Sequence, residues 1–209
     1  MGDYLRLLTV DGRDVPLAAL QRAVPAGAVW AVDHPGMQGN YLAVGPEAGD
    51  LGRVWATVER NPVGPDTLGA EEVAEFLDGL EAGGPPSAVR WLADYLEGVR
   101  AVYAVRVDPE AIRGRPEAVE AVVAVRAALR AAVGGVGEWD GQGFTNEDDR
   151  LIWLSPRTTL RGRADAAVLD ASSGAWLPFE LDLDDPDDRA GFSRGEVPGR
   201  RTAARGRSR

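Results

Sequence analysis

The run Arg100-Ala-Val-Tyr-Ala-Val-Arg-Val107 narrows the choice of fold more than any other part of this sequence. Its near-continuous apolar character is typical of a strand in the centre of a sheet. Segments with helical periodicity lie on both sides of it, and segments with strand character occupy both ends of the chain. This order predicts an α+β fold: a mixed, largely antiparallel sheet with about four helices packed mainly on one face.

Three of the helices are indicated by periodicity and by the residues that begin and end them. An amphipathic helix is predicted from an apolar stripe at i, i+3, i+4 and i+7, formed by Val73, Phe76, Leu77 and Leu80. The acids between these residues, Glu72 among them, are expected to face water. Ser87 is expected to cap a second helix. Pro116 and Gly134 mark the limits of a third, long helix.

Apolar and alternating runs predict strands in the first and last thirds of the chain. The final third is expected to be β-rich, and its acidic segment 140–149 is expected to form one elaborate hairpin loop. Residues 61–66, which contain two prolines and a glycine, are expected to form a rigid loop. The expected strands are 4–10, 28–33, 40–45, 53–59, 100–107, 136–139, 151–154, 164–169 and 175–181.

Length and charge predict one acidic domain followed by a basic tail. With 209 residues and 44% hydrophobic residues, the chain is long and apolar enough to bury a core. Residues 189–209 contain seven arginines and one glutamate, a net charge of 7 − 1 = +6, whereas residues 1–188 carry 16 − 32 = −16. We expect a single acidic domain over residues 1–184 and a disordered tail over residues 185–209.

Composition excludes several classes of chemistry. There is no cysteine, so no disulfide, thiolate metal site or cysteine nucleophile is possible. All 23 basic residues are arginine, which excludes Schiff-base chemistry and the P-loop lysine. The single histidine, His34, excludes a site with two histidine ligands, and we expect it to be an ordinary loop residue. No cofactor is predicted.

The expected partners and location follow from charge and hydropathy. We find neither a signal peptide nor an apolar run of the roughly 20 residues that a membrane helix needs, so a cytoplasmic location is expected. The net charge of −10 disfavours nucleic acid and anionic membranes as partners and favours a basic protein.

Two segments of the chain carry a recognisable pattern. Val58 to Val73 has the character of a strand end, a loop with Asn, Pro/Gly, Asp and Leu, and a Glu-Glu helix start, and Gly135 to Phe144 is similar to a hairpin with the pattern Gly…Asp-Gly-Glu-Gly-aromatic. In these segments the chain resembles an uncharacterised family of bacterial proteins of unknown function. The pattern spans residues 53–154, and it implies a buried strand at residues 101–107. Because Gln142 replaces the glutamate of the pattern, no carboxylate role is carried over to that position.

Glu59 and Asn61 leave the end of a strand beside the rigid loop, a place where binding and catalytic residues are common. A carboxylate there is suited to act as a general base or to bind a cation. The alternative is structural: Glu59 would pair with a nearby arginine, and Asn61 would stabilise the turn.

The segment 140–149 is the second candidate site. Asp140, Asn146, Glu147, Asp148 and Asp149 supply the oxygen ligands that Ca²⁺ or Mg²⁺ prefers, although their spacing is not that of an EF-hand. A solvated hairpin tip is the alternative. Trp139 and Trp153 flank the segment, where they would form either an aromatic wall for a ligand or a cross-strand core pair. The acidic run 182–188 is expected to be solvated.

These observations predict a non-enzymatic, acidic protein-interaction domain that binds a basic partner protein through its acidic hairpin and helix faces. The alternative is a carboxylate-dependent enzyme or a divalent-cation-binding protein that uses Glu59 together with the 140–149 hairpin. The sequence leaves open whether the chain is an enzyme.

Overall fold

The computed structural model describes residues 3–24, 27–32, 41–80 and 83–198. Ten strands form one sheet in the order β10-β9-β8-β7-β6-β1-β5-β4-β3-β2, and all neighbours are antiparallel except the parallel pair β8–β9. The strands are β1 (Asp3–Thr9), β2 (Ala28–Ala31), β3 (Tyr41–Gly45), β4 (Ala56–Pro62), β5 (Ala101–Val107), β6 (Val136–Trp139), β7 (Gly143–Thr145), β8 (Leu151–Leu154), β9 (Arg163–Leu169) and β10 (Trp176–Asp182).

The helices in the described part of the chain are α1 (Leu17–Ala23), α2 (Leu68–Leu80), α3 (Pro86–Glu97), α4 (Pro109–Ile112), α5 (Pro116–Val133) and α6 (Pro186–Ser193), with one 3₁₀ turn, η1 (Leu51–Arg53). None of these helices is both long enough and apolar enough to cross a membrane. The α+β class and the largely antiparallel sheet are confirmed.

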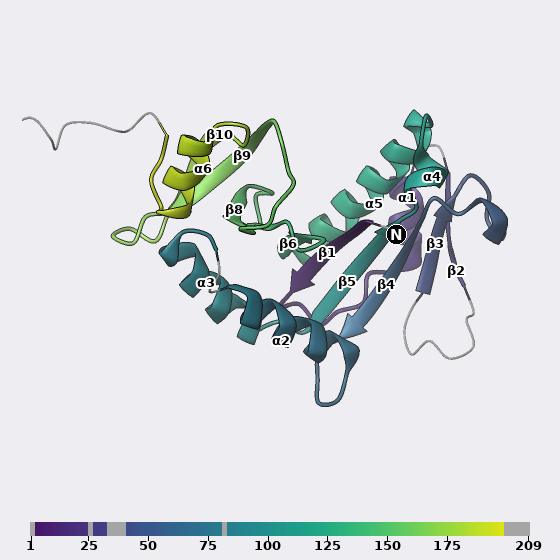
Figure 1. Ribbon diagram of the computed structural model, residues 1–209. Helices are drawn as coiled ribbons and strands as arrows, with labels where there is room; N and C mark the ends of the chain where they lie inside the picture. Colours follow the sequence, from purple (N-terminus) through teal and green to yellow (C-terminus); the bar gives the residue numbers. More distant parts are fainter. Residues whose placement is uncertain (1–2, 25–26, 33–40, 81–82, 199–209) are drawn as a thin grey trace, which may run out of the picture.

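The helices cover both faces of the sheet, so the prediction that they lie mainly on one face is wrong. α1 and α5 pack on one face, where they bury Leu7 and Tyr103. α2 and α3 pack on the other, where they bury Leu8 and Val102. Figure 1 shows α5 and the α2–α3 pair on opposite sides of β1, β5 and β4. The near-continuous apolar character of β5 has this cause, because alternate residues of the strand enter two different cores.

Two elements, α5 and β5, lie where the sequence predicts them. α5 runs from Pro116 to Val133, as the proline and the glycine at its ends predict. β5 lies between β1 and β4 in the centre of the sheet.

The end of β4 and the start of α3 differ from what the sequence predicts. β4 continues through Asn61 to Pro62, so the first two residues of the expected rigid loop belong to the strand. Pro62 is tolerated because it stands at the last position of β4, opposite Ala101. α3 begins after Pro85 without a side-chain cap. The hydroxyl of Ser87 instead donates to the carbonyl oxygen of Leu169, which joins α3 to β9.

The acidic segment 140–149 contains a strand that the sequence analysis did not predict. β7 lies between β6 and β8 and pairs with both, so the expected hairpin of residues 136–139 with 151–154 is wrong. Asp140 and Gly141, both with positive φ, form the tight turn that joins β6 to β7. The apolar Phe144 of β7 packs against Trp153 in the α2–α3 core, which stabilises this three-residue strand.

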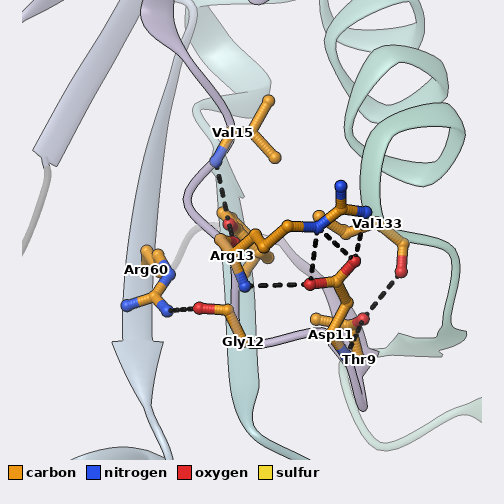
Figure 2. A network of polar contacts seen from close by, with 8 residues as sticks. Thr9, Asp11, Gly12, Arg13, Val15, Arg60 and Val133 are labelled. Atoms are coloured by element: carbon orange, nitrogen blue, oxygen red, sulfur yellow. Dashed lines mark hydrogen bonds and ion pairs between the residues drawn. The ribbon is translucent and has the colours of Figure 1, made fainter.

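A polar network holds the segment that follows β1 (Figure 2). The hydroxyl of Thr9 donates to the carbonyl oxygen of Val133 at 2.8 Å, so the end of β1 is tied to the end of α5. Arg60 of β4 donates through Nη2 to the carbonyl oxygen of Gly12 at 2.7 Å, and its Nε lies 2.9 Å from a carboxylate oxygen of Asp14. These contacts are structural, since each joins the segment to a neighbouring element.

The chain beyond residue 185 is not the disordered tail that we expected, at least as far as residue 198. Asp185 caps α6 by accepting from the backbone N–H of Asp187, and Pro186 occupies the first turn. Phe192 of α6 is 0% exposed and lies in a core with Phe179 and Leu181. Residues 199–209 lie outside the described residues, as does His34.

The Phe192→Ala variant tests whether α6 is part of the folded domain. Truncation of a fully buried phenylalanine should lower the free energy of unfolding by about 3 kcal/mol, because it leaves a cavity. Urea denaturation followed by circular dichroism measures the change. Ser193→Ala, at an exposed position of the same helix, should change stability by less than about 0.5 kcal/mol. Equal stability of both variants would contradict the docking of α6.

Candidate functional site

A row of side chains crosses the face of the sheet on which α2 and α3 lie. Strand register places Glu138 of β6 opposite Arg6 of β1, Arg6 opposite Ala104 of β5, and Ala104 opposite Glu59 of β4. Tyr41 of β3 continues the row beyond Glu59. Directly opposite residues share one face, so the charged side chains of this row are neighbours across four strands.

α2 and α3 cover only one end of this face. Tyr4 and Thr57 are partly exposed, and Arg106 is exposed. We use the name open face for the part formed by Tyr4, Arg6, Thr57, Glu59 and Arg106.

Arg6 joins three elements at the boundary of the open face. Its Nε donates to Glu72 of α2 at 3.0 Å, and its Nη1 donates to Glu138 at 2.8 Å. The guanidinium carbon lies 4.9 Å from the ring centroid of Tyr4 and 5.6 Å from that of Phe76. Glu72, which we expected to face water, therefore faces the sheet.

Glu138 is a buried carboxylate whose charge Arg6 balances. Its side chain is 1% exposed, and burial raises its pKa although the N–H of Gly141 and the guanidinium of Arg6 favour the charged form. Gly141 donates to Glu138 Oε1 at 2.5 Å, so the turn after β6 is held by the same carboxylate. We did not predict Glu138 as a site residue, because Val136-Gly-Glu-Trp139 has no pattern that indicates a buried charge.

Glu59 differs from Glu72 and Glu138 because no arginine of the described part of the chain pairs with it. Burial raises its pKa, and the negative charge of Glu72 raises it further. The buried Asn61 donates through Nδ2 to Glu72 at 3.1 Å, so Asn61 positions Glu72 instead of stabilising a turn. Glu59 is thus a partly buried carboxylate that no cation of the described residues pairs with.

A pocket of about 530 Å³ lies beside the open face, and Thr57 and Arg106 belong to its lining whereas Glu59 does not. Tyr41, the cross-strand partner of Glu59, lines it together with Thr57 and Arg106. The pocket extends to the turn η1 and to the start of α4, where Asp108 and Glu110 add carboxylates. Its volume lies within the range of pockets that hold small ligands or single side chains of a partner.

The acidic segment 140–149, by contrast, is organised around an internal cation. Arg130 of α5 donates to the carbonyl oxygens of Asn146 and Glu147 and to the carboxylate of Asp149, the last at 2.8 Å. A guanidinium therefore takes the oxygen atoms that a metal ion would need. The described residues include no group of three or more His, Cys, Asp or Glu side chains arranged to hold a metal ion.

The other predicted site residues of this segment have structural roles or lie in solvent. The side-chain oxygen of the buried Asn146 accepts from the backbone N–H groups of Asp148 and Arg150, which shapes the turn. The Asp148 carboxylate lies 3.4 Å from Arg150, and Glu147 is exposed. Asp140 occupies the tight turn after β6.

Trp139 and Trp153 do not form the aromatic wall that we considered. Trp153 is buried in the α2–α3 core, and its indole N–H donates to the carbonyl oxygens of Leu80 and Gly83. Trp139 lies opposite Leu5, whose side chain packs in the core of α5, so the two indoles are on different faces of the sheet. Asp149 pairs with Arg130 of α5, on the face of the sheet opposite to Glu59. Glu59 and Asp149 therefore do not form one site.

Comparisons of the chain with protein-family models, with curated proteins and with solved structures find no match. We therefore infer the function from the geometry of the open face.

The Arg6→Met variant tests the ion pair beneath the open face. Removing the guanidinium leaves the charge of Glu138 buried without a partner, which should lower the free energy of unfolding at pH 7 by about 3 kcal/mol. Restoring neutrality in the double variant Arg6→Met/Glu138→Gln should recover most of this loss. The exposed Arg22→Met is the matched control and should change stability by less than about 0.5 kcal/mol.

The stability that Arg6→Met loses should depend on pH in one direction. The pKa of Glu138 is raised in the folded state, so the folded protein holds its proton to higher pH than the unfolded chain. The destabilisation should therefore shrink as the pH falls through the folded pKa toward the unfolded value of about 4.3. Urea denaturation at a series of pH values measures it, and a loss that grows on acidification would contradict the assignment.

Proposed function

We propose that this protein is an interaction domain that binds a basic segment of a partner protein through its open face. Glu59 is the anchor, and it receives a guanidinium or ammonium group of the partner. The single observation that carries this proposal is that Glu59 is a partly buried carboxylate for which the described part of the chain supplies no cation. Desolvating an anion without a partner costs free energy, and an incoming cation would recover that cost.

The charge around Glu59 supports a cationic ligand. Three carboxylates, Glu59, Glu72 and Glu138, stand near two cations, Arg6 and Arg106, so the local balance is negative by one charge. Asp108 and Glu110 also line the pocket beside the open face, where Glu110 is paired with Arg113 at 2.6 Å. The net charge of −10 would also draw a basic partner toward the protein over longer distances.

The cross-strand neighbours of Glu59 are compatible with a planar cation. On one side lies Ala104, whose side chain is short, and on the other lies Tyr41, which belongs to the pocket lining. A guanidinium bound to both oxygens of a carboxylate is a strong and directional contact. The acidic hairpin, which we first considered as the docking surface, is less suitable because Arg130 and Arg150 already pair with Asp149 and Asp148.

A second function is favoured by one observation. A carboxyl group with a raised pKa beside a pocket is a candidate general acid or base, so an enzyme with Glu59 as its proton-transfer group is the alternative. An interaction domain would account for the raised pKa of Glu59 and also for the excess of negative charge around it. We therefore prefer this function.

The test uses a short arginine-rich peptide as the probe. In a ¹H–¹⁵N NMR titration, we expect the largest amide shifts in β4 and β5, near Thr57, Glu59 and Ala104. Isothermal titration calorimetry should show that Glu59→Gln weakens peptide binding about five- to tenfold, which corresponds to about 1 to 1.4 kcal/mol. Glu117→Gln removes the same charge from an exposed position of α5, on the other side of the sheet, and should weaken binding less than twofold.

The comparison of Glu59→Gln with Glu117→Gln decides whether the proposed site is correct. Equal effects of Glu59→Gln and Glu117→Gln would show that the peptide responds only to net charge, and the interaction site at Glu59 would then be wrong. In that case the acid–base alternative for Glu59 is the one left to examine.

A further inference from the structure

The open face carries a cation as well as the carboxylate of Glu59. Arg106 of β5 lies opposite Thr57 of β4, and both residues line the pocket of about 530 Å³. The guanidinium carbon of Arg106 lies 5.9 Å from the ring centroid of Tyr4, and no acid of the described residues pairs with this guanidinium. The hydroxyl of Thr57 has no hydrogen-bond partner among the same residues. Two donors thus lie side by side at the pocket without an acceptor from the described chain.

The acids that line the pocket have other partners. Glu110 pairs with Arg113 at 2.6 Å, and Asp108 accepts from the backbone N–H groups of Glu110 and Ala111 at the start of α4. Arg106 is exposed, so water solvates its guanidinium and the arrangement costs the unbound protein little. The consequence of an uncompensated cation at this position is its effect on what the open face can bind.

Arg106 lies close to the cation that Glu59 receives under the proposed function. Glu59 and Thr57 are alternate residues of β4 on one face of the sheet, with Cα atoms about 6.6 Å apart. Because Arg106 is opposite Thr57, it is a diagonal neighbour of Glu59, at a Cα distance of about 7 to 8 Å. A partner that carries only cations therefore brings a like charge toward Arg106, which opposes binding. An acid next to the partner's cation turns this repulsion into attraction.

We infer that the partner segment is extended and carries an acidic residue two positions from the basic residue that binds Glu59. This inference rests on the proposed function, because Glu59 must hold the basic residue. Residues i and i+2 of an extended chain lie on one side, about 6.6 Å apart, which matches the spacing of Glu59 and Thr57 along β4. The acid then enters the pocket and accepts from the guanidinium of Arg106 and the hydroxyl of Thr57. Arg106 thus selects segments of mixed charge over purely basic ones.

The test uses three pentapeptides with blocked ends and the full chain. Arg-Ala-Glu-Ala-Arg places the acid two positions from a basic residue in either chain direction. Arg-Ala-Ala-Glu-Arg has the same composition, but its acid lies on the opposite side of the extended chain from both arginines. Arg-Ala-Gln-Ala-Arg has no acid. In ¹H–¹⁵N NMR titrations, the first peptide should bind about three- to fivefold more tightly than the second, the range expected for one exposed ion pair.

A substitution of Arg106 should act on one peptide only. Arg106→Gln should weaken the binding of Arg-Ala-Glu-Ala-Arg about three- to fivefold and should not weaken the binding of the other two. Arg22→Gln removes the same charge from an exposed position of α1, on the other side of the sheet, and should change all three affinities less than twofold. The inference is overturned if Arg106→Gln changes the affinities of Arg-Ala-Glu-Ala-Arg and Arg-Ala-Ala-Glu-Arg to the same extent.

The Glu59→Gln variant separates this inference from the proposed function. If Glu59→Gln weakens all three peptides while Arg106→Gln affects them equally, Glu59 still anchors a basic segment and only the acidic neighbour is wrong. If Glu59→Gln weakens none of them, the proposed function is wrong and the inference fails with it.

Discussion

The burial of the Glu138 carboxylate is the constraint on which the rest of the structure depends. A charged side chain with 1% exposure is tolerated only with a partner, and the partner is Arg6 of the neighbouring strand β1. Because Arg6 also binds Glu72, it fixes α2 over one end of the sheet. The position of α2 then decides which part of the sheet stays open and places the negative charge of Glu72 next to Glu59.

The arginines of this lysine-free chain fall into two groups. Arg6, Arg60 and Arg130 donate to oxygen atoms of elements that are distant in sequence. Arg106 and Arg126 instead lie over the rings of Tyr4 and Trp139, and no acid of the described residues pairs with either of them. Guanidinium groups suit both tasks, because their planar fork binds oxygen pairs and also stacks on rings.

Local signals in the sequence predicted local structure well. α5 follows from Pro116 and Gly134, and the stripe from Val73 to Leu80 gave α2. α6 was missed although Asp185 and Pro186 are an ordinary helix start, because the acidic run around them indicated a solvated segment. β7 was missed because three residues are too few to show a period.

The candidate site was only partly predictable because its contacts are long-range. Glu59 was identified from its place at a strand end. Its chemistry depends on Arg6, which is 66 residues from Glu72 and 132 residues from Glu138 in sequence. Strand register and the orientation of α2 bring these residues together, and neither is encoded in a local pattern. Glu72 was expected to face water for this reason.

NMR titration of the side-chain carboxyl carbon of Glu59 measures whether this carboxylate lacks a cation. We expect a pKa above the ordinary value of a glutamate, and a return toward that value in Glu72→Gln, because the neighbouring negative charge is then gone. A pKa at or below the ordinary value would show that Glu59 already has a cation partner, and the proposed role of Glu59 would then be wrong.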